Sequence, residues 1–361
     1  MESFAFWYKQ CENCSSKTEE DTDGDQRVTA TMNFNLWCQC GWKSKPYLDI
    51  GFKIRNLRNA ETLFFFLPFD IQEEEKTTYI EDLGCKFSHT ELVDAVFNES
   101  YATTIAANKK TIRVQAANNS SLDDTGERFY IYQLDIEHDM HLESFADGTI
   151  ISIKTANITN SAIEENAVYY LRFRILGQDL GFLIHKYDAP SRVIQSLFNT
   201  TYMIDFRFHN VRSLHKTLIE RFSQADTKVV AVSSLHFLLI TKAYIDVDIN
   251  NIGFKGIRKI EKGVWEDYVN RNDTEDLLAY HIAQRPKEEK GADGKKNYLD
   301  SSELFAKFRV ERSVLWWYLL FTIALGAIGS VIATILLQPM LTCVGDFLSK
   351  VTAKLAILFV A

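Results

Sequence analysis

The sequence predicts an α+β protein, in which a β-rich, soluble N-terminal body is followed by a C-terminal transmembrane helix and a second, amphipathic helix. Three observations predict this class. Short runs of alternating or continuous apolar residues recur through residues 1–284, as strands require. The run from Val314 to Leu337 contains no charged residue. The chain as a whole nevertheless has a mean hydropathy of −0.14, which is typical of a largely water-soluble protein.

Residues 1–60 are predicted to form an N-terminal strand region that carries two close cysteine pairs. Two residues separate Cys11 from Cys14, and one separates Cys38 from Cys40. Four thiolates from two tight turns can close a tetrahedral site, so the pattern favours a structural Zn²⁺ ion as cofactor. The alternative is a set of reduced thiols on adjacent strands, since structural disulfides are rare in a cytosolic protein.

Residues 61–284 are predicted to form a β-rich cytosolic sensor body. Helical spacing of apolar residues, with a capping-box opening at Ser88 and Glu91, predicts a short helix over 88–99. The same spacing predicts further helices over 211–224 and 262–285. The strand-like segments of the body are 61–71, which ends near Pro68, 111–116, 128–136, 149–155, 167–176, 181–187, 201–209 and 228–240.

One stretch of this body, from Phe206 to Phe222, is rich in cations interleaved with aromatic residues. Charges can bind phosphates and rings can stack on bases, so the stretch is a candidate site for a nucleotide or a single-stranded oligonucleotide. Two of its candidate ligand-binding residues would share a strand face, and three would share a helix face. The alternative is a solvated helix that follows a strand of the sheet. The candidates are Arg207, His209, Arg212, His215 and Lys216.

Catalytic motifs are not evident in the sequence. His138 and His141 in EHDMH resemble a fragment of a metal site, but no third ligand follows at a diagnostic spacing, so a solvated turn is the preferred interpretation. The chain has no phosphate-cradling glycine loop, no Gly-x-Ser-x-Gly and no His-Glu-x-x-His. We therefore expect a protein that is not an enzyme.

Residues 285–313 are predicted to be a charged linker followed by a pre-membrane helix, and residues 314–337 a transmembrane helix. The 24 uncharged residues of the latter exceed the roughly 20 that cross a bilayer as a helix. Trp316, Trp317 and Tyr318 suit the membrane interface, and Pro339 is expected to end the helix. Small residues four apart would let copies of the span pack closely, unless they only reflect the composition of such spans. These residues are Gly326, Gly329, Ser330 and Ala333.

The last segment, 340–361, is predicted to be a helix with one apolar and one polar face. Its polar positions recur at four-residue steps. Three alternatives stand for this helix: it lies at the membrane interface, it spans the membrane and lines a pore in an oligomer, or it packs on the soluble body. The candidate pore-lining residues are Thr342, Asp346, Lys350 and Lys354.

The N-terminal sequence and the distribution of charge indicate on which side of the membrane the N-terminal body lies. The N-terminus lacks the features of a secretory signal, and cations cluster just before the span, so we expect a cytosolic N-terminal body at the inner (cytoplasmic) membrane. The net charge of the whole chain is −8, and the part from Val314 carries +1, which leaves −9 on residues 1–313. This acidity argues against indiscriminate binding to nucleic acid, although it allows a local basic pocket.

The layout of the chain resembles membrane effectors of bacterial anti-phage defence, in particular the effector of the Hailong type. The resemblance lies in the polar body before RPKEEKGADGKK, at 285–296, the span SVLWWYLLFTIALGAIGSVIATILL from Ser313, and the amphipathic tail. It implies an oligomeric membrane channel whose opening depolarises the infected cell. It also implies a companion nucleotidyltransferase whose DNA oligomer keeps the channel shut.

Three functional hypotheses follow from the sequence. The first is a homo-oligomeric channel or pore in the lipid bilayer, gated by a cytosolic ligand such as a nucleotide or a DNA oligomer. The second is a tail-anchored adaptor that binds a partner and conducts nothing. The third, an enzyme anchored to the membrane, is the weakest because no catalytic constellation is visible.

Overall fold

The computed structural model describes most of the 361 residues. The described ranges are 3–11, 26–38, 45–97, 100–106, 110–116, 128–146, 148–160, 167–176, 180–187, 199–249, 253–261, 263–269, 276–286, 297–311 and 315–360. They form two compact units. One comprises residues 1–187 and 201–310, and the other comprises 188–200 and 311–361.

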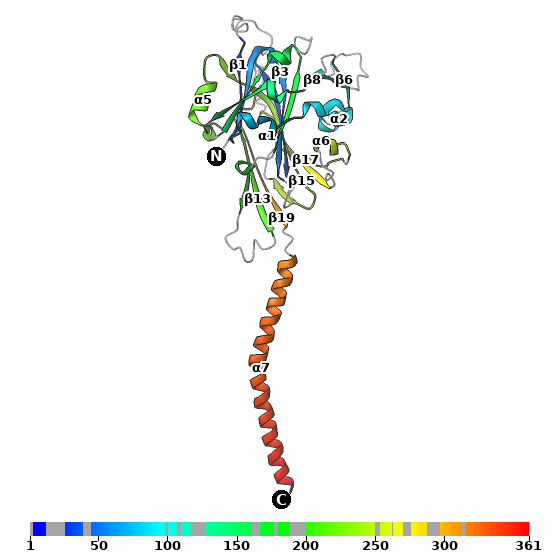
Figure 1. Ribbon diagram of the computed structural model, residues 1–361, viewed down its shortest axis with the longest axis vertical. Helices are drawn as coiled ribbons and strands as arrows, with labels where there is room; N and C mark the ends of the chain where they lie inside the picture. The colour runs from blue at the N-terminus through cyan, green and yellow to red at the C-terminus, as the bar shows by residue number, and fades with distance from the viewer. Residues whose placement is uncertain are drawn as a thin grey trace. The chain divides into compact units, whose positions relative to one another are not determined.

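Three β-sheets build the first unit (Figure 1). The largest has ten strands, in the order β17 (Phe254–Lys259), β18 (Leu277–Gln284), β15 (Ala231–Lys242), β2 (Thr29–Cys38), β3 (Tyr47–Arg55), β11 (Tyr169–Ile175), β8 (Arg128–Tyr132), β7 (Thr111–Ala116) and β6 (Tyr101–Ile105), with β5 (Ile80–Asp82) paired to β11. The β15–β2 and β11–β8 pairs are parallel.

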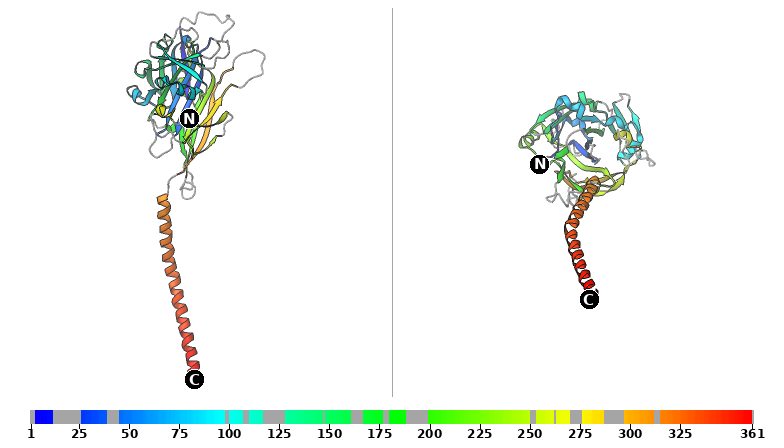
Figure 2. Two further views of the ribbon diagram at one scale, coloured as in Figure 1. Left: turned by 90° about the vertical axis from the view of Figure 1, so that its right-hand side faces the viewer. Right: turned by 60° about the horizontal axis from the view of Figure 1, so that its bottom comes forward.

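The other two sheets are smaller. One has the strand order β14 (Thr227–Val229), β1 (Ala5–Gln10), β4 (Ala60–Leu67), β10 (Gly148–Lys154) and β9 (Met140–Phe145). The other has the order β12 (Ile184–Tyr187), β13 (Asn199–Phe208), β19 (Ser302–Glu311) and β16 (Asp246–Ile249). Figure 2 shows these strands from two further directions.

The helices of this unit are short. They are α1 (Lys76–Tyr79), α2 (Thr90–Phe97), α3 (Ile136–Asp139), α4 (Ala156–Thr159), α5 (Lys216–Phe222) and α6 (Glu266–Val269). Single 3₁₀ turns are η2 (Leu57–Asn59), η3 (Glu73–Glu75), η4 (Gly84–Ser88), η5 (Leu180–Phe182) and η6 (Val211–Ser213). The β-rich body predicted from the sequence is therefore confirmed.

Phenylalanine rings join the three sheets in one core. Phe4 contacts Phe34 of the ten-stranded sheet, Phe65 of the five-stranded sheet and Phe206 of the four-stranded sheet, with ring centroids 5.4, 5.9 and 5.4 Å apart. All four rings are at most 1% exposed. Aromatic pairs at such distances add stability beyond the area they bury.

The ten-stranded sheet has a second face, which points away from this core. Side chains alternate between faces along a strand, so β2 turns Phe34 to the main core and Trp37 to a second cluster. In that cluster α2 and α6 cover part of the outer face, through residues such as Leu92 and Tyr268. The rest of the outer face carries polar and basic side chains, which are described below.

Two predicted helices are strands in the structure. The prediction over 262–285 was wrong in part, because only α6 is helical and β18 lies between β15 and β17. Continuous apolar residues in a strand buried on both sides resemble a buried helix in sequence. The pre-membrane helix was also wrong: β19 buries Leu304, Ala306 and Phe308, at the two-residue period of a strand. Residues 287–296 of the predicted linker lie outside the described residues.

The second unit contains α7, a single helix from Leu315 to Val360. The break expected at Pro339 was wrong, because the helix continues through this residue. A proline removes only one hydrogen bond from the ladder, and long apolar helix formers flank it on both sides. The window Tyr318–Ala353 is long and apolar enough to cross a membrane, and none of it is buried.

Candidate anion-binding groove

The predicted ligand-binding stretch does not form one cationic site. His209 lies just after β13, and its imidazole is buried and accepts a hydrogen bond from the Phe6 amide at 2.7 Å. Burial lowers the pKa of His209 to about 4, so this side chain is neutral at pH 7. Arg207 donates to both carboxylate oxygens of Asp205, at 2.9 and 2.8 Å, and to Ser213 at 2.9 Å.

The other three residues of that stretch are exposed around the start of α5. Arg212 belongs to η6, and His215 caps α5, where its Nδ1 accepts from the Thr217 amide at 3.4 Å. Lys216 is the first residue of the helix. This arrangement agrees with the solvated-helix alternative for Arg212, His215 and Lys216.

The structure describes only part of the predicted cysteine site, and all of the EHDMH turn. Cys11 is half-buried after β1 and Cys38 is buried at the end of β2, whereas Cys14 and Cys40 lie outside the described residues. The zinc site therefore stays a prediction. In EHDMH, His138 lies 3.0 Å from the Asp135 carboxylate, and this hydrogen bond raises the pKa of His138. His141 lies 3.4 Å from Glu73, so each histidine is paired with a carboxylate.

The candidate oligomer and pore residues all lie on α7. Gly326 and Gly329 have open space where a Cβ would be added. Thr342 donates to the backbone oxygens of Gln338 and Pro339, at 3.1 and 2.8 Å. Ser330, Ala333, Asp346 and Lys350 are exposed, and the side chain of Lys354 lies outside the described residues. Their roles in assembly and conduction remain predictions.

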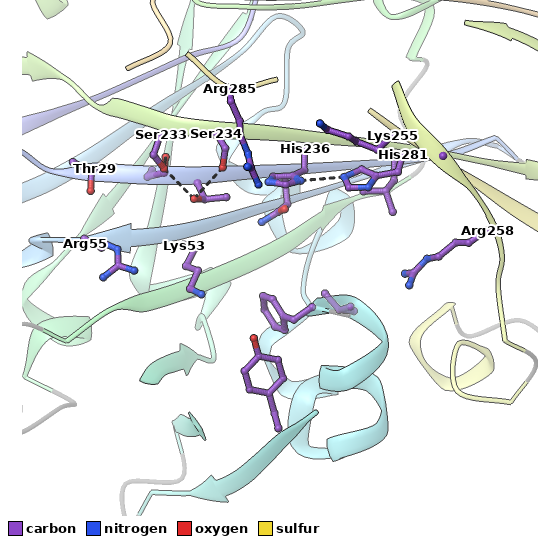
Figure 3. A pocket seen from close by; sticks show the side chains of 18 of the residues that line it. Thr29, Lys53, Arg55, Ser233, Ser234, His236, Lys255, Arg258, His281 and Arg285 are labelled. Carbon is purple, nitrogen blue, oxygen red and sulfur yellow. Dashed lines mark hydrogen bonds between the residues drawn. The ribbon is translucent and has the colours of Figure 1, made fainter. Parts of the chain in front are cut away.

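A groove on the outer face of the ten-stranded sheet is the strongest candidate site of the described residues (Figure 3). It has a volume of about 650 Å³, and strands β3, β2, β15, β18 and β17 form it together with α2 and β6. We call it the basic groove. Its lining residues are Thr29, Ala30, Thr31, Asn33, Lys53, Arg55, Val96, Phe97, Tyr101, Ser233, Ser234, His236, Leu238, Lys255, Gly256, Ile257, Arg258, His281 and Arg285.

Cations lie on both sides of the basic groove. Lys53 and Arg55 come from β3, and the Lys53 ammonium lies 4.5 Å from the centre of the Phe129 ring. Lys255, Arg258 and Arg285 come from β17 and the end of β18. Arg258 donates to the backbone oxygen of Ala95 at 2.9 Å, which ties β17 to α2. Both interactions hold a cationic side chain in place before any ligand arrives.

Hydroxyl groups line the floor between these cations. A β-bulge in β15 between Val232 and Ser234 lets two consecutive serines reach the groove. Thr31 Oγ1 lies 3.1 Å from Ser233 Oγ and accepts from Ser234 Oγ at 3.4 Å. Neutral hydroxyls of this kind can donate to phosphate or carboxylate oxygens.

None of the described residues that line the groove is acidic, although the body carries a net charge of −9. Five Lys and Arg side chains therefore face one space without a carboxylate among them. A concave site lined by one sign of charge concentrates ions of the opposite sign. The half-buried Phe97 adds aromatic surface to the wall, whereas Tyr101 beside it is only 5% exposed. The groove is suited to an anion that also carries a flat, apolar part.

Two histidines touch each other in the floor. His236 Nδ1 lies 3.0 Å from His281 Nε2, and the two rings meet edge to edge, with an interplanar angle of 20° and centroids 5.3 Å apart. Burial, then His281 and the cations Arg285 and Lys255, lower the pKa of His236 to about 4. Burial, Arg258 and Lys255 also lower the pKa of His281. Both imidazoles are therefore neutral at pH 7 while the groove is empty.

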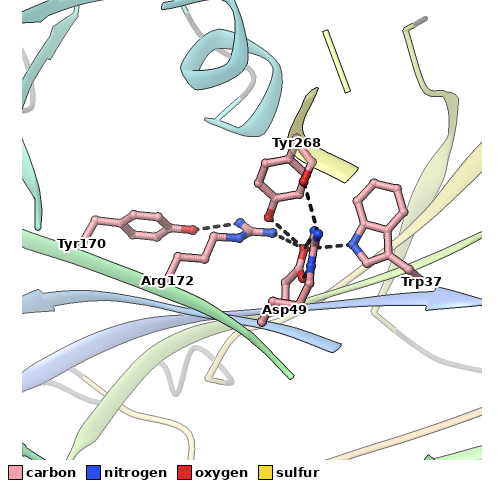
Figure 4. A network of polar contacts seen from close by, with 6 residues as sticks. Trp37, Asp49, Tyr170, Arg172 and Tyr268 are labelled. Carbon is pink, nitrogen blue, oxygen red and sulfur yellow. Dashed lines mark hydrogen bonds and ion pairs between the residues drawn. The ribbon is translucent and has the colours of Figure 1, made fainter. Parts of the chain in front are cut away.

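A buried polar network lies next to the groove on the same face of β3 (Figure 4). Asp49 accepts from Trp37 Nε1 at 2.8 Å, from the Tyr268 hydroxyl at 2.8 Å and from Arg174 at 2.6 and 3.1 Å. Arg172 lies 3.5 Å from the same carboxylate. Two buried guanidinium groups thus share one carboxylate, which makes Asp49 the balancing charge of this region.

Gly51 separates this network from the groove. A Cβ at this position would lie 2.6 Å from the Tyr170 hydroxyl, so only glycine leaves room for that ring. The Tyr170 hydroxyl in turn accepts from Arg172 at 2.9 Å. Because Lys53 is two residues further along β3, the network fixes the strand that carries one side of the groove.

The chain matches no protein-family model and no curated protein. Among solved structures, one match is the Fcho1 Mu homology domain of Danio rerio with a bound Eps15 peptide. It covers 78% of this chain and 79% of that chain, at 9% identity and a TM-score of 0.14. A likeness at this score carries no argument about fold or function.

Sequence reasoning did not find the basic groove. Its cations lie on strands far apart in the chain, from Lys53 to Arg285, and only the pairing of β15 with both β2 and β18 brings them together. One local signal was present. Lys53 and Arg55 alternate with the buried Phe52 and Ile54, which indicates a strand with a cationic outer face.

Proposed function

We propose that this protein is a membrane effector whose soluble body binds an anionic ligand and whose C-terminal helix acts in the bilayer. The observation that carries the proposal is a cationic groove, with no acid among the described residues that line it, on a net acidic body, in the same chain as an exposed apolar helix. The ligand class that fits best is a nucleotide or a short single-stranded oligonucleotide, because cations can bind its phosphates while the half-buried Phe97 ring can contact a base.

The helix supports an action in the membrane. Its 46 residues correspond to roughly 69 Å at 1.5 Å per residue, about twice the hydrocarbon thickness of a bilayer. One helix cannot enclose a conduit, so we propose that several copies assemble, with the small-residue face of Gly326 and Ser330 in contact. The polar positions Asp346 and Lys350 then line the pore. We place the body in the cytosol at the inner membrane.

In this proposal the ligand gates the assembly. A ligand can shift a closed and an open state only through a difference in its affinity for the two. By the resemblance of the chain's layout to Hailong-type effectors, we propose a role in anti-phage defence, with a DNA oligomer from a companion nucleotidyltransferase as the gating ligand.

An enzyme is a weaker proposal for the same groove. Two histidines among cations could in principle act as acid and base on a phosphodiester. The acid and the base of such a reaction stand on opposite sides of the phosphorus, whereas His236 and His281 touch each other at 3.0 Å. Their arrangement therefore favours binding over cleavage.

The first test of this proposal is whether the apolar helix α7 inserts into membranes. The double change Leu325→Arg and Ile328→Arg places two charges in the uncharged run, at about 3 kcal/mol each near the bilayer centre. We expect the full chain to resist alkaline extraction from membranes and the variant to be released. The control changes both positions to alanine and should stay in the membrane. An extractable wild-type chain would contradict the proposal.

Measurements of ion conduction distinguish the proposed channel from the alternative of a tail-anchored adaptor. We expect purified full chain in planar bilayers to give discrete currents, and Asp346→Asn or Lys350→Gln to change their unitary size, because charges in a pore attract or repel ions. A chain that lacks 340–361 should be silent. If an unrelated single span in place of 314–361 preserves function in cells, the tail-anchored adaptor is correct instead.

A further inference from the structure

The contact between His236 and His281 limits how many protons the pair can carry. A hydrogen bond of 3.0 Å between two ring nitrogens needs one proton between them, so one ring donates and the other accepts. Two protons in this contact would repel each other. The pair is therefore either neutral or singly protonated, and an added proton must sit on an outer nitrogen, His236 Nε2 or His281 Nδ1.

The surroundings of the pair set which of the two states is stable. The rings lie on neighbouring strands, β15 and β18, and both line the basic groove. No described lining residue is acidic, and an uncharged ring is favoured among cations. The charged and titratable groups that face the groove are Lys53 and Arg55 from β3, Lys255 and Arg258 from β17, Arg285 from the end of β18, and Tyr101 from β6.

An anion in the groove reverses this balance. Its negative charges offset the cations that disfavour an imidazolium, and its oxygens can accept from a protonated outer nitrogen. We propose that an anionic ligand enters the basic groove together with one proton, which solvent supplies and the His236–His281 pair holds. The inference rests on the proposed binding function of the groove and adds the way in which pH regulates it.

Proton uptake on binding makes the affinity for the ligand depend on pH. The pair binds more protons in the complex than in the empty groove, so affinity rises as pH falls. The rise begins near the pKa of the pair in the complex and ends near its pKa in the empty groove, which for His236 is about 4. A single proton permits at most a tenfold change per pH unit, and we expect roughly 10- to 30-fold between pH 8 and pH 6.

The test uses a probe that does not titrate in this range. An oligothymidylate of about six nucleotides carries phosphodiesters and thymines, neither of which takes up a proton between pH 5 and pH 8. We expect calorimetric titration of the full chain in detergent, at pH 6.5 in two buffers of different ionisation enthalpy, to show uptake of roughly one proton per bound probe. In the double variant His236→Asn with His281→Asn, the heat of binding should no longer depend on the buffer, which means that no proton is taken up with the probe.

Two controls keep the outcomes distinct. His215→Asn removes an exposed histidine outside the groove while asparagine still caps α5, and it should leave the proton uptake unchanged. If the double variant unfolds, His236→Gln with His281→Gln, which also removes both imidazoles, provides the same comparison. Binding of the probe without proton uptake would overturn the inference and leave the binding function intact. Failure of the probe to bind would overturn both.

Discussion

Replacement of Asp49 by asparagine should lower the free energy of unfolding by about 3–5 kcal/mol, because it leaves two buried guanidinium groups without their carboxylate. Arg172 and Arg174 are each about 1% exposed, and Asp49 is the acidic partner of both among the described residues. A loss of this size corresponds to a fall in melting temperature of roughly 5–15 °C. Thermal or urea unfolding of the full chain in detergent, followed by tryptophan fluorescence, measures it.

The matched control is the same substitution at Asp276. This residue forms an ion pair with Lys259 at 3.1 Å, but both side chains are about two-thirds exposed, at 71% and 68%. Exposed pairs contribute little, so Asp276→Asn should cost less than about 0.5 kcal/mol. Equal effects of the two substitutions would show that Asp49 does not balance the buried charge.

The pH dependence of stability separates Asp49 from the buried histidines. Burial opposes the charged form of Asp49, but Arg174 and Arg172 outweigh burial and lower the pKa of this carboxyl below its ordinary value of 3.8. A lowered carboxyl pKa stabilises the fold above the ordinary value, and this contribution is lost as pH falls below about 4. We expect the difference between wild type and Asp49→Asn to shrink only in that range.

His209 and His236 act at a higher pH. Their pKa values are lowered to about 4, so between the ordinary value of 6.5 and about 4 the unfolded chain binds protons that the folded chain does not. Stability therefore falls as pH drops from 6.5 to 4, before Asp49 begins to titrate. An acid titration of wild type should show these two windows in that order.

The strands were predictable where one face is buried and the other polar. In β7 the buried Ile112 and Val114 alternate with the half-buried Arg113 and Gln115, and the predicted bounds of 111–116 match the structure. The pattern failed for β18, which has buried residues on both of its faces. There Ala279, Tyr280 and Ile282 are all buried, and no period distinguishes a strand from a helix.

The candidate site was less predictable, because exposure of a cation depends on tertiary contacts. Arg172 and Arg174 stand at alternate positions of a strand, as surface residues do, yet both are buried. His209 belongs to the most basic stretch of the sequence, but the Phe6 amide engages its ring in the interior. Conversely, Lys255 and Arg285 attract no notice in the sequence, and strand pairing places both beside the histidine pair.

The double charge reversal Lys255→Glu with Arg285→Glu should weaken binding of the oligothymidylate probe by about 100-fold or more. Each change removes a cation that can bind a phosphate, and each new carboxylate also repels the probe. Both side chains are exposed, so folding should be retained. The slope of log affinity against log salt concentration should also become shallower, by the contribution of roughly two phosphate contacts, since fewer counterions are released. Fluorescence anisotropy over a salt series measures both quantities.

The stretch favoured by the sequence provides a control of equal charge. Arg212→Glu with Lys216→Glu changes the net charge by the same amount, and both residues are exposed near α5 rather than in the groove. At physiological ionic strength the Debye length is about 8 Å, so charges outside the site are largely screened. We expect this variant to bind within about threefold of wild type. If it instead lost affinity while the groove variant did not, the ligand would bind at α5, and the basic groove would not be the site.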